Sequence, residues 1–183
     1  VFMKTIREQE IEALFIAQKV TPEHFTQVVG VFQHRVYGLV RRMVLIHADA
    51  DDVTQDVFIR IWEKKHQFQG QSALYTWIYR IATNTTLEFL RKKKRSTTQR
   101  LDHNEYIQQL KADAYFCGDD AELKFQEALL QLPDKQRLVF QMKYFDAMKY
   151  EAISEILGTS VGALKASYHH ATQKLKHALQ EEN

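Results

Sequence analysis

The side chains best suited to acid–base or metal chemistry have spacings that do not support it. Glu151 and Glu155 lie four positions apart, so they would form a carboxylate pair on one helix face. His169 and His170 are adjacent, whereas metal chelation on a helix favours an i, i+4 pair. The single cysteine, Cys117, excludes an internal disulfide and a cysteine-based zinc site. We therefore predict no catalytic residue, no metal site and no cofactor. A helical enzyme remains an alternative that rests on the two glutamates.

The charged residues are segregated into blocks, although the formal net charge is only +2. Residues 49–59 contain four acids and no base, whereas residues 89–101 contain six bases and no acid. Residues 156–180 again lack acids and contain three lysines and three histidines. Any one block is compatible with a solvated helix face. Two basic blocks on separate helical units and one acidic block together predict two contacts with anionic partners and one with a basic partner.

Residues 150–168 have the pattern of a helix-turn-helix. A two-turn amphipathic helix is followed by Gly158, which supplies a left-handed residue at which the chain can reverse. Thr159 or Ser160 then caps a longer helix, of the kind that enters the major groove of DNA. The face opposite its apolar stripe carries small or donor-bearing side chains: Lys165, Ala166, Ser167, His169, His170 and Lys174. A helical hairpin that only packs is the alternative interpretation.

The acidic block predicts a helix that starts at Asp49 and buries one apolar face. The residues expected inside are Val53, Val57, Phe58 and Ile61. The residues left outside are Asp52, Gln55, Asp56, Ile59, Arg60 and Glu63. Ile59 stands in this polar field beside Trp62, as an apolar anchor within a charged rim would. The pattern indicates a protein-binding surface, and a solvated helix is the alternative.

Residues 72–95 combine aromatic and basic side chains on one expected helix, which Ser72 is predicted to cap. The predicted outward stripe is Thr76, Arg80, Thr83, Asn84 and Arg91, with Tyr75, Trp77 and Tyr79 around it. Aromatic rings can stack on unpaired nucleobases, and the basic side chains of the following run can hold a phosphate backbone. Trp77 is equally compatible with a place in the core.

The elements that must position these residues are helices. Proline and glycine together make up only eight of 183 residues, which is too few turns for a sheet-rich fold. Thr21-Pro22-Glu23 predicts the start of a helix that runs to about Met43, and a short helix is expected at about 104–112. No apolar run approaches the roughly 18 residues of a membrane span, and the N-terminus has no secretory pattern. We expect an all-α, cytoplasmic protein without membrane insertion.

Three ordered motifs resemble those of extracytoplasmic-function sigma factors, the minimal two-domain form of the bacterial sigma-70 family. Residues 51–62 resemble the family's polymerase-binding helix, and residues 68–84 with the following basic run resemble its minus-ten region. Residues 132–137, continuing through 150–171, resemble its minus-thirty-five domain. The resemblance implies two small helical domains, at 22–95 and 122–183, joined by a linker at 96–121. It leaves an amphipathic extension at 1–21 unexplained.

The resemblance also implies roles for the residues that match its motifs. The outward face of residues 52–60 would bind the largest subunit of core RNA polymerase. The minus-ten element would be opened and held by Phe68, Gln71, Ser72, Ala73, Trp77, Arg80, Asn84, Arg91, Lys92, Lys93, Lys94 and Arg95. The minus-thirty-five element would be read by Lys165, Ala166, Ser167, His169, His170 and Lys174. The implied partners are core polymerase, promoter DNA and an anti-sigma factor, and the alternative function is a stand-alone helix-turn-helix regulator.

Overall fold

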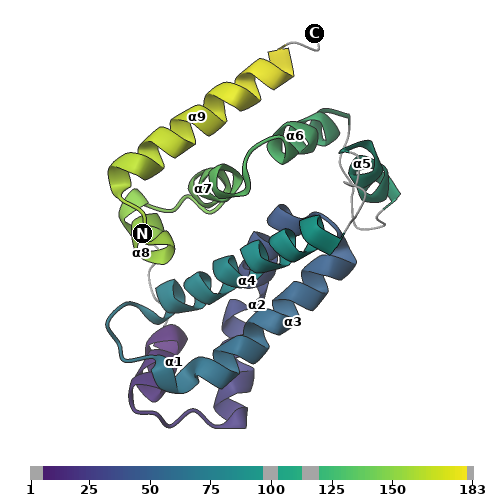
Figure 1. The fold of residues 1–183 in the computed structure, drawn as a ribbon. Helices are drawn as coiled ribbons and strands as arrows, with labels where there is room; N and C mark the ends of the chain where they lie inside the picture. Colours follow the sequence, from purple (N-terminus) through teal and green to yellow (C-terminus); the bar gives the residue numbers. More distant parts are fainter. Residues whose placement is uncertain (1–5, 97–102, 113–119, 181–183) are drawn as a thin grey trace.

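The computed structural model describes residues 6–96, 103–112 and 120–180, and every regular element in these ranges is helical. The elements in chain order are α1 (Ile6–Ile16), α2 (Pro22–Val44), α3 (His47–Lys64), the 3-10 turn η1 (Lys65–Gln67), α4 (Leu74–Ser96), α5 (His103–Ala112), α6 (Asp120–Leu130), α7 (Asp134–Tyr144), α8 (Tyr150–Leu157) and α9 (Val161–Gln180) (Figure 1). The predicted all-α fold is confirmed.

Several predicted helix ends are confirmed in detail. Thr21 caps α2 by accepting from the backbone N–H of His24, and Pro22 occupies the first turn. Ser160 caps α9, since its hydroxyl oxygen accepts from the backbone N–H of Ala163 at 3.3 Å. Gly158 ends α8 with a φ of 61°, the left-handed conformation that a glycine adopts without strain. The helix-turn-helix therefore has the predicted local geometry.

Two helix starts differ from the prediction. The acidic helix α3 starts at His47 rather than Asp49, because the His47 ring bonds to the Tyr37 hydroxyl and pairs with Asp51 one turn on. Ser72 does not cap α4, which starts at Leu74. The first helical bond there runs from the Trp77 N–H to the Ala73 carbonyl. Phe68 and Leu74 are both buried, and this anchoring draws the intervening residues into a loop.

Helix α4 crosses the middle of the molecule between the N-terminal helices α1–α3 and the C-terminal helices α7 and α8 (Figure 1). On its N-terminal side, α2, α3 and α4 pack around a core that includes Phe32, Leu39, Val57, Ile61 and Ile78. Each of these side chains is almost fully removed from solvent. Helix α4 is thus covered on two sides, which explains why it buries more of its surface than an ordinary amphipathic helix.

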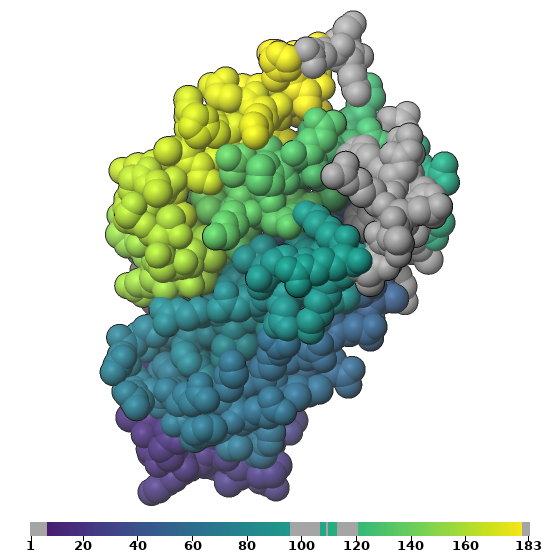
Figure 2. Space-filling model, in the orientation of Figure 1, coloured from purple at the N-terminus to yellow at the C-terminus, as the bar shows by residue number. Residues whose placement is uncertain are grey.

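The C-terminal helices contribute to two apolar clusters, one of their own and one that they share with the N-terminal helices. Helices α6, α7 and α9 enclose a small cluster of Ala128, Leu129, Leu132, Phe140, Ala171 and Leu175. The remaining buried residues of this half, Leu138, Val139, Met142, Met148, Ile153, Ile156 and Leu164, belong to the same apolar cluster as α2–α4. Figure 2 shows the green atoms of this half resting directly on the teal atoms of α4, while the yellow end of α9 lies beyond them. The two expected halves therefore share a continuous core.

The segment predicted as a linker contains the expected short helix, α5, which buries Ile107 and Leu110. Cys117 lies outside the described residues. Within the described ranges, no helix is long and apolar enough to cross a lipid bilayer. The proposed domain boundaries at residues 21, 95 and 121 stay predictions.

Candidate nucleic-acid and protein interfaces

The outward face of α3 is exposed as predicted. Asp52, Gln55 and Asp56 are exposed, and Ile59 keeps 49% of its surface accessible although it is a large apolar residue. The four apolar residues predicted to lie inside are buried. An exposed isoleucine surrounded by acids suits a protein partner that offers an apolar pocket with a basic rim.

Arg60 lies at the edge of this face and is already engaged within the chain. Its guanidinium donates to Glu88 Oε2 at 2.7 Å, and Lys92 pairs with Glu88 Oε1 at 2.9 Å. The Arg60 guanidinium, which has the larger effect, and the Lys92 ammonium lower the pKa of Glu88 to about 2. The pair links α3 to α4, so Arg60 has a structural role besides the predicted polymerase contact.

The loop at 68–73 has a buried root and an exposed tip. Phe68 is buried, whereas Gln71 is exposed, and Ser72 and Ala73 are half-buried. The rings of Phe68 and Trp77 meet edge to face with centroids 5.6 Å apart. The structure places Phe68 and the half-buried Trp77 against the core. The exposed tip is the part of the loop that a base can reach.

The outward stripe predicted for α4 is partly wrong. Arg80 and Asn84 are exposed as expected, but Thr76 and Thr83 are buried. The reason is that α8 packs on the side of α4 that the periodicity leaves to solvent. Arg80 itself donates to the backbone carbonyl of Glu155 in α8 at 2.6 Å.

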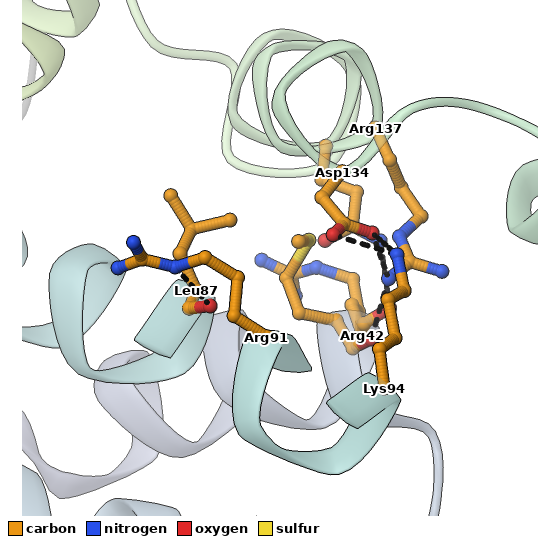
Figure 3. Close-up of polar contacts among 8 residues, drawn as sticks. Arg42, Leu87, Arg91, Lys94, Asp134 and Arg137 are labelled. Atoms are coloured by element: carbon orange, nitrogen blue, oxygen red, sulfur yellow. Dashed lines mark hydrogen bonds and ion pairs between the residues drawn. The ribbon is translucent and has the colours of Figure 1, made fainter. Parts of the chain in front are cut away.

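Most of the basic run at the end of α4 makes intramolecular contacts. Lys93 pairs with Asp49 at 2.5 Å, and Lys94 pairs with Asp134 of α7 at 2.8 Å. Figure 3 shows Asp134 facing both Lys94 and Arg137, while Arg91 turns back to the Leu87 carbonyl of its own helix. Lys92 is held by Glu88 as described above, and Arg95 is exposed. Three of the five predicted phosphate-binding residues, Lys92, Lys93 and Lys94, are therefore paired with acids in this arrangement.

The outer face of α9 carries the predicted set. Lys165, Ala166, His169, His170 and Lys174 are exposed, and Ser167 is half-buried. Leu164, Ala171 and Leu175 are buried on the opposite side. The Lys165 ammonium lies 5.8 Å from the centre of the Tyr150 ring, and Lys174 reaches the amide oxygen of Gln136 at 3.4 Å. The helix presents donors along one exposed side, as a recognition helix does.

A set of polar contacts joins α2 to the C-terminal half, and the sequence pattern did not predict it. Arg42 pairs with Asp146 at 2.5 Å, and burial raises the pKa of Asp146 although this guanidinium lowers it. The Gln141 amide donates to the Arg42 carbonyl at 2.7 Å, and Arg137 donates to the Met43 carbonyl at 3.0 Å. The available signal was that Arg137 and Gln141, both buried, interrupt the apolar face of α7.

The described residues offer no cluster of three His, Cys, Asp or Glu side chains that could hold a metal ion. Glu151 and Glu155, the candidate acid–base pair, are both exposed on α8. The exposed polar surfaces that the structure shows are the acidic face of α3 and the donor-bearing faces of α4 and α9.

Both halves of the chain match families of bacterial transcription initiation factors, and the second half carries the helix-turn-helix. Residues 28–96 match the family model for sigma-70 region 2, and residues 122–175 match that for sigma-70 region 4. The chain belongs to the sigma-70 family, and within it to the extracytoplasmic-function (ECF) group. It is accordingly a sigma factor that directs promoter recognition rather than a stand-alone regulator.

Curated relatives agree with this assignment, and solved structures share the fold. The chain is 32% identical to the ECF RNA polymerase sigma factor SigW of Bacillus subtilis over 86% of this chain and 89% of that protein. It is 28% identical to the ECF RNA polymerase sigma-E factor of Escherichia coli K12, over 89% and 90% of the two chains. The fold resembles CnrH in its complex with the cytosolic domain of CnrY, with a TM-score of 0.70 and 20% identity over 97% and 99% of the two chains.

A second structure, the sigma factor RpoE of Bartonella quintana in complex with the anti-sigma factor NepR, aligns with a TM-score of 0.65 and 22% identity. That alignment covers 87% of this chain and 98% of the other. At these identities the two structures establish the shared fold, including its two helical halves.

Proposed function

We propose that the exposed face of α3 binds core RNA polymerase through Asp52, Gln55, Asp56 and Ile59, with Arg60 at its edge. Support comes from the exposure of these acids around an apolar residue, while the opposite face of α3 is buried. Charge complementarity with a basic surface would speed the encounter, and burial of Ile59 would hold the complex. All four of these side chains are exposed to solvent, so this surface is available to a partner in the arrangement of the two halves seen here.

The tip of the loop at 68–73 is proposed to hold a base that is flipped out of the non-template strand of the minus-ten element. Gln71 and Ser72 offer hydrogen-bonding groups at this tip, and Ala73 offers a small apolar surface. Arg80, Asn84 and the bases at 91–95 would follow the adjacent backbone. Flipping a base costs a few kcal/mol, which binding to the polymerase first would help to supply.

The exposed side of α9 is proposed to read the minus-thirty-five element in the major groove. Lys165, His169 and His170 carry donors toward base edges or phosphates, and Lys174 lies one turn further on. The small side chains of Ala166 and Ser167 would allow a close approach to the bases. The buried stripe of Leu164, Ala171 and Leu175 fixes the orientation of this face.

In the structure the two halves pack against each other, an arrangement called the compact state below (Figure 1). Promoter binding and the compact state compete for the same side chains. Arg80 cannot bind both the Glu155 carbonyl and DNA, and Lys94 cannot bind both Asp134 and a phosphate. The two halves therefore have to separate from one another before the minus-ten contacts form. Core polymerase would bind the two halves at separate positions, and this binding would supply the free energy for their separation.

The polymerase is proposed to perform the chemistry, so the chain itself has no active site and acts where the polymerase is, in the cytoplasm. An anti-sigma factor is proposed as a further partner, because two structures with this fold were determined in complex with partner proteins, one of them a named anti-sigma factor. Such a partner would hold the chain away from the polymerase or from DNA.

The observation that carries the proposal is that α3 and α9 each bury an apolar stripe and expose the predicted polar face. The test is selection of promoter DNA by holoenzyme from a duplex library with two randomised blocks. Lys165→Ala is expected to weaken binding about tenfold and to relax the upstream block, while Gln71→Ala relaxes the downstream block. Lys111→Ala, an exposed lysine of α5, is the matched control for Lys165→Ala. Selection of the same two blocks by every variant would contradict the residue assignment.

A further inference from the structure

We propose that α1 positions the loop at 68–73 for minus-ten recognition, through Phe15, Ile16 and Gln18. This inference rests on the proposed function of that loop. The match to sigma-70 region 2 begins only at residue 28, so α1 lies outside the matched segment. The structure nevertheless packs the end of α1 against the root of the loop, by three separate contacts.

The first contact is a cluster of three aromatic rings from three elements. Phe15 of α1 meets Phe68 of the loop at 6.0 Å and Trp77 of α4 at 5.9 Å, in each case edge to face. Phe15 and Phe68 are almost fully buried. Since the loop leaves the core at Phe68, the position of the Phe15 ring fixes where the loop starts.

The second contact is a polar bridge from the end of α1. Gln18 has a positive φ of 57°, and its amide nitrogen donates to the Phe15 carbonyl and to the Phe68 carbonyl, each at 3.1 Å. The bridge joins the Phe15 carbonyl, which also accepts from the Gln18 backbone N–H, to the backbone of a loop 50 positions away. One side chain thus ties the orientation of the loop backbone to α1.

The third contact lies at the turn of the loop. Gly70 has a φ of 70°, and a Cβ atom placed on it would approach Ile16 Cδ1 to 3.1 Å. Ile16 therefore lies against the Gly70 backbone, although 53% of its own surface stays exposed. Ile16 therefore restricts the backbone of Gly70, which as a glycine would otherwise be conformationally free.

The other end of α1 is fastened to α2, which makes α1 a rigid support. Glu8 is buried and accepts from the Arg35 guanidinium at 2.6 Å, and Ile11 packs into the main core. A loop that is held before DNA arrives loses less conformational entropy on binding a base. Gln18 and Ile16 are thus positioning residues, which act on DNA through the tip residue Gln71.

The test uses a single-stranded non-template oligonucleotide whose minus-ten sequence has first been selected with wild-type holoenzyme. The affinity of each variant holoenzyme is measured for this oligonucleotide and for its single-base variants. Gln18→Met keeps the side-chain length and removes the donor, and Gln9→Met is the matched control on the exposed side of α1. Gln18→Met is expected to weaken binding about three- to tenfold and to reduce discrimination between bases. Binding to core polymerase and to the upstream duplex element is expected to stay unchanged. Ile16→Ala, which truncates a half-exposed side chain, is expected to act in the same direction.

Gln71→Ala separates the two levels of the proposal. If Gln71→Ala lowers the affinity while Gln18→Met and Ile16→Ala both behave like Gln9→Met, the role of α1 is refuted and the function of the loop stands. If Gln71→Ala has no effect either, the proposed function of the loop is refuted together with the inference. Equal losses of upstream and minus-ten binding in Gln18→Met would also refute it, because they would indicate general destabilisation.

Discussion

The guanidinium of Arg80 donates to the backbone carbonyl of Glu155 at 2.6 Å, across 75 positions of sequence. Arg80 lies on the side of α4 proposed to face minus-ten DNA, and Glu155 lies on the first helix of the helix-turn-helix. The compact state thus occupies a side chain proposed for promoter contact. The same relation holds between Lys94 of α4 and Asp134 of α7.

The polar part of this interface is imperfectly satisfied. Among the described residues, the buried atoms Arg42 Nε, Gln141 Oε1 and Asp146 Oδ2 find no hydrogen-bond partner. Buried polar atoms without partners cost free energy, roughly 1–3 kcal/mol each. The polar contacts of this interface therefore contribute little net stabilising free energy. This favours the separation of the two halves that the proposed function requires.

Substitution of Arg42 is expected to loosen the two halves. Arg42→Ala removes the ion pair with Asp146 and leaves a buried carboxylate, a change of about 1–3 kcal/mol against the compact state. Small-angle scattering is expected to show a larger radius of gyration than the roughly 16 Å of a compact chain of this length. Arg7→Ala, on the exposed side of α1, serves as the control. An unchanged radius in Arg42→Ala would show that the apolar contacts alone hold the halves together.

The two glycines of the helix-turn-helix are expected to respond in opposite directions to alanine. Gly158 has a φ of 61°, so Gly158→Ala introduces backbone strain and lowers the free energy of unfolding by about 1 kcal/mol or more. Gly162 lies inside α9 with no atom within 4 Å of an added Cβ, so Gly162→Ala raises it by about 0.4–1 kcal/mol. Urea unfolding of both variants measures the difference, and equal effects would contradict the left-handed assignment at Gly158.

The carboxyl of Glu88 is expected to titrate far below its ordinary pKa of 4.5, at about 2. A carboxyl whose pKa is lower in the folded chain stabilises the fold when ionised. This contribution is therefore complete above pH 4.5 and is lost as the pH falls toward 2. Arg60→Gln removes the largest cause and is expected to raise the pKa toward 4.5, more than Lys92→Gln does. NMR titration of the Glu88 side chain tests this, and an equal pKa in Arg60→Gln would rule out the pair.

Much of the site was predictable because it depends on helical periodicity. The exposed and buried faces of α3 and α9 follow from residue spacing within one helix, and both are as predicted. The burial of Thr76 and Thr83 was not predictable, since it depends on α8 packing against α4 from a distant part of the chain. The contact between Gln18 and Phe68 was not predictable for the same reason, because the two residues lie 50 positions apart.

The measurement that tests the central claim most directly is co-elution with purified core RNA polymerase on a sizing column. The wild type is expected to co-elute, and Asp56→Arg is expected to be lost from the complex, because a cation replaces an exposed acid at the centre of the α3 face. Glu10→Arg, the same change at an exposed site on α1, is expected to co-elute like the wild type. Co-elution of Asp56→Arg at wild-type level would contradict the assignment of α3 as the polymerase-binding surface.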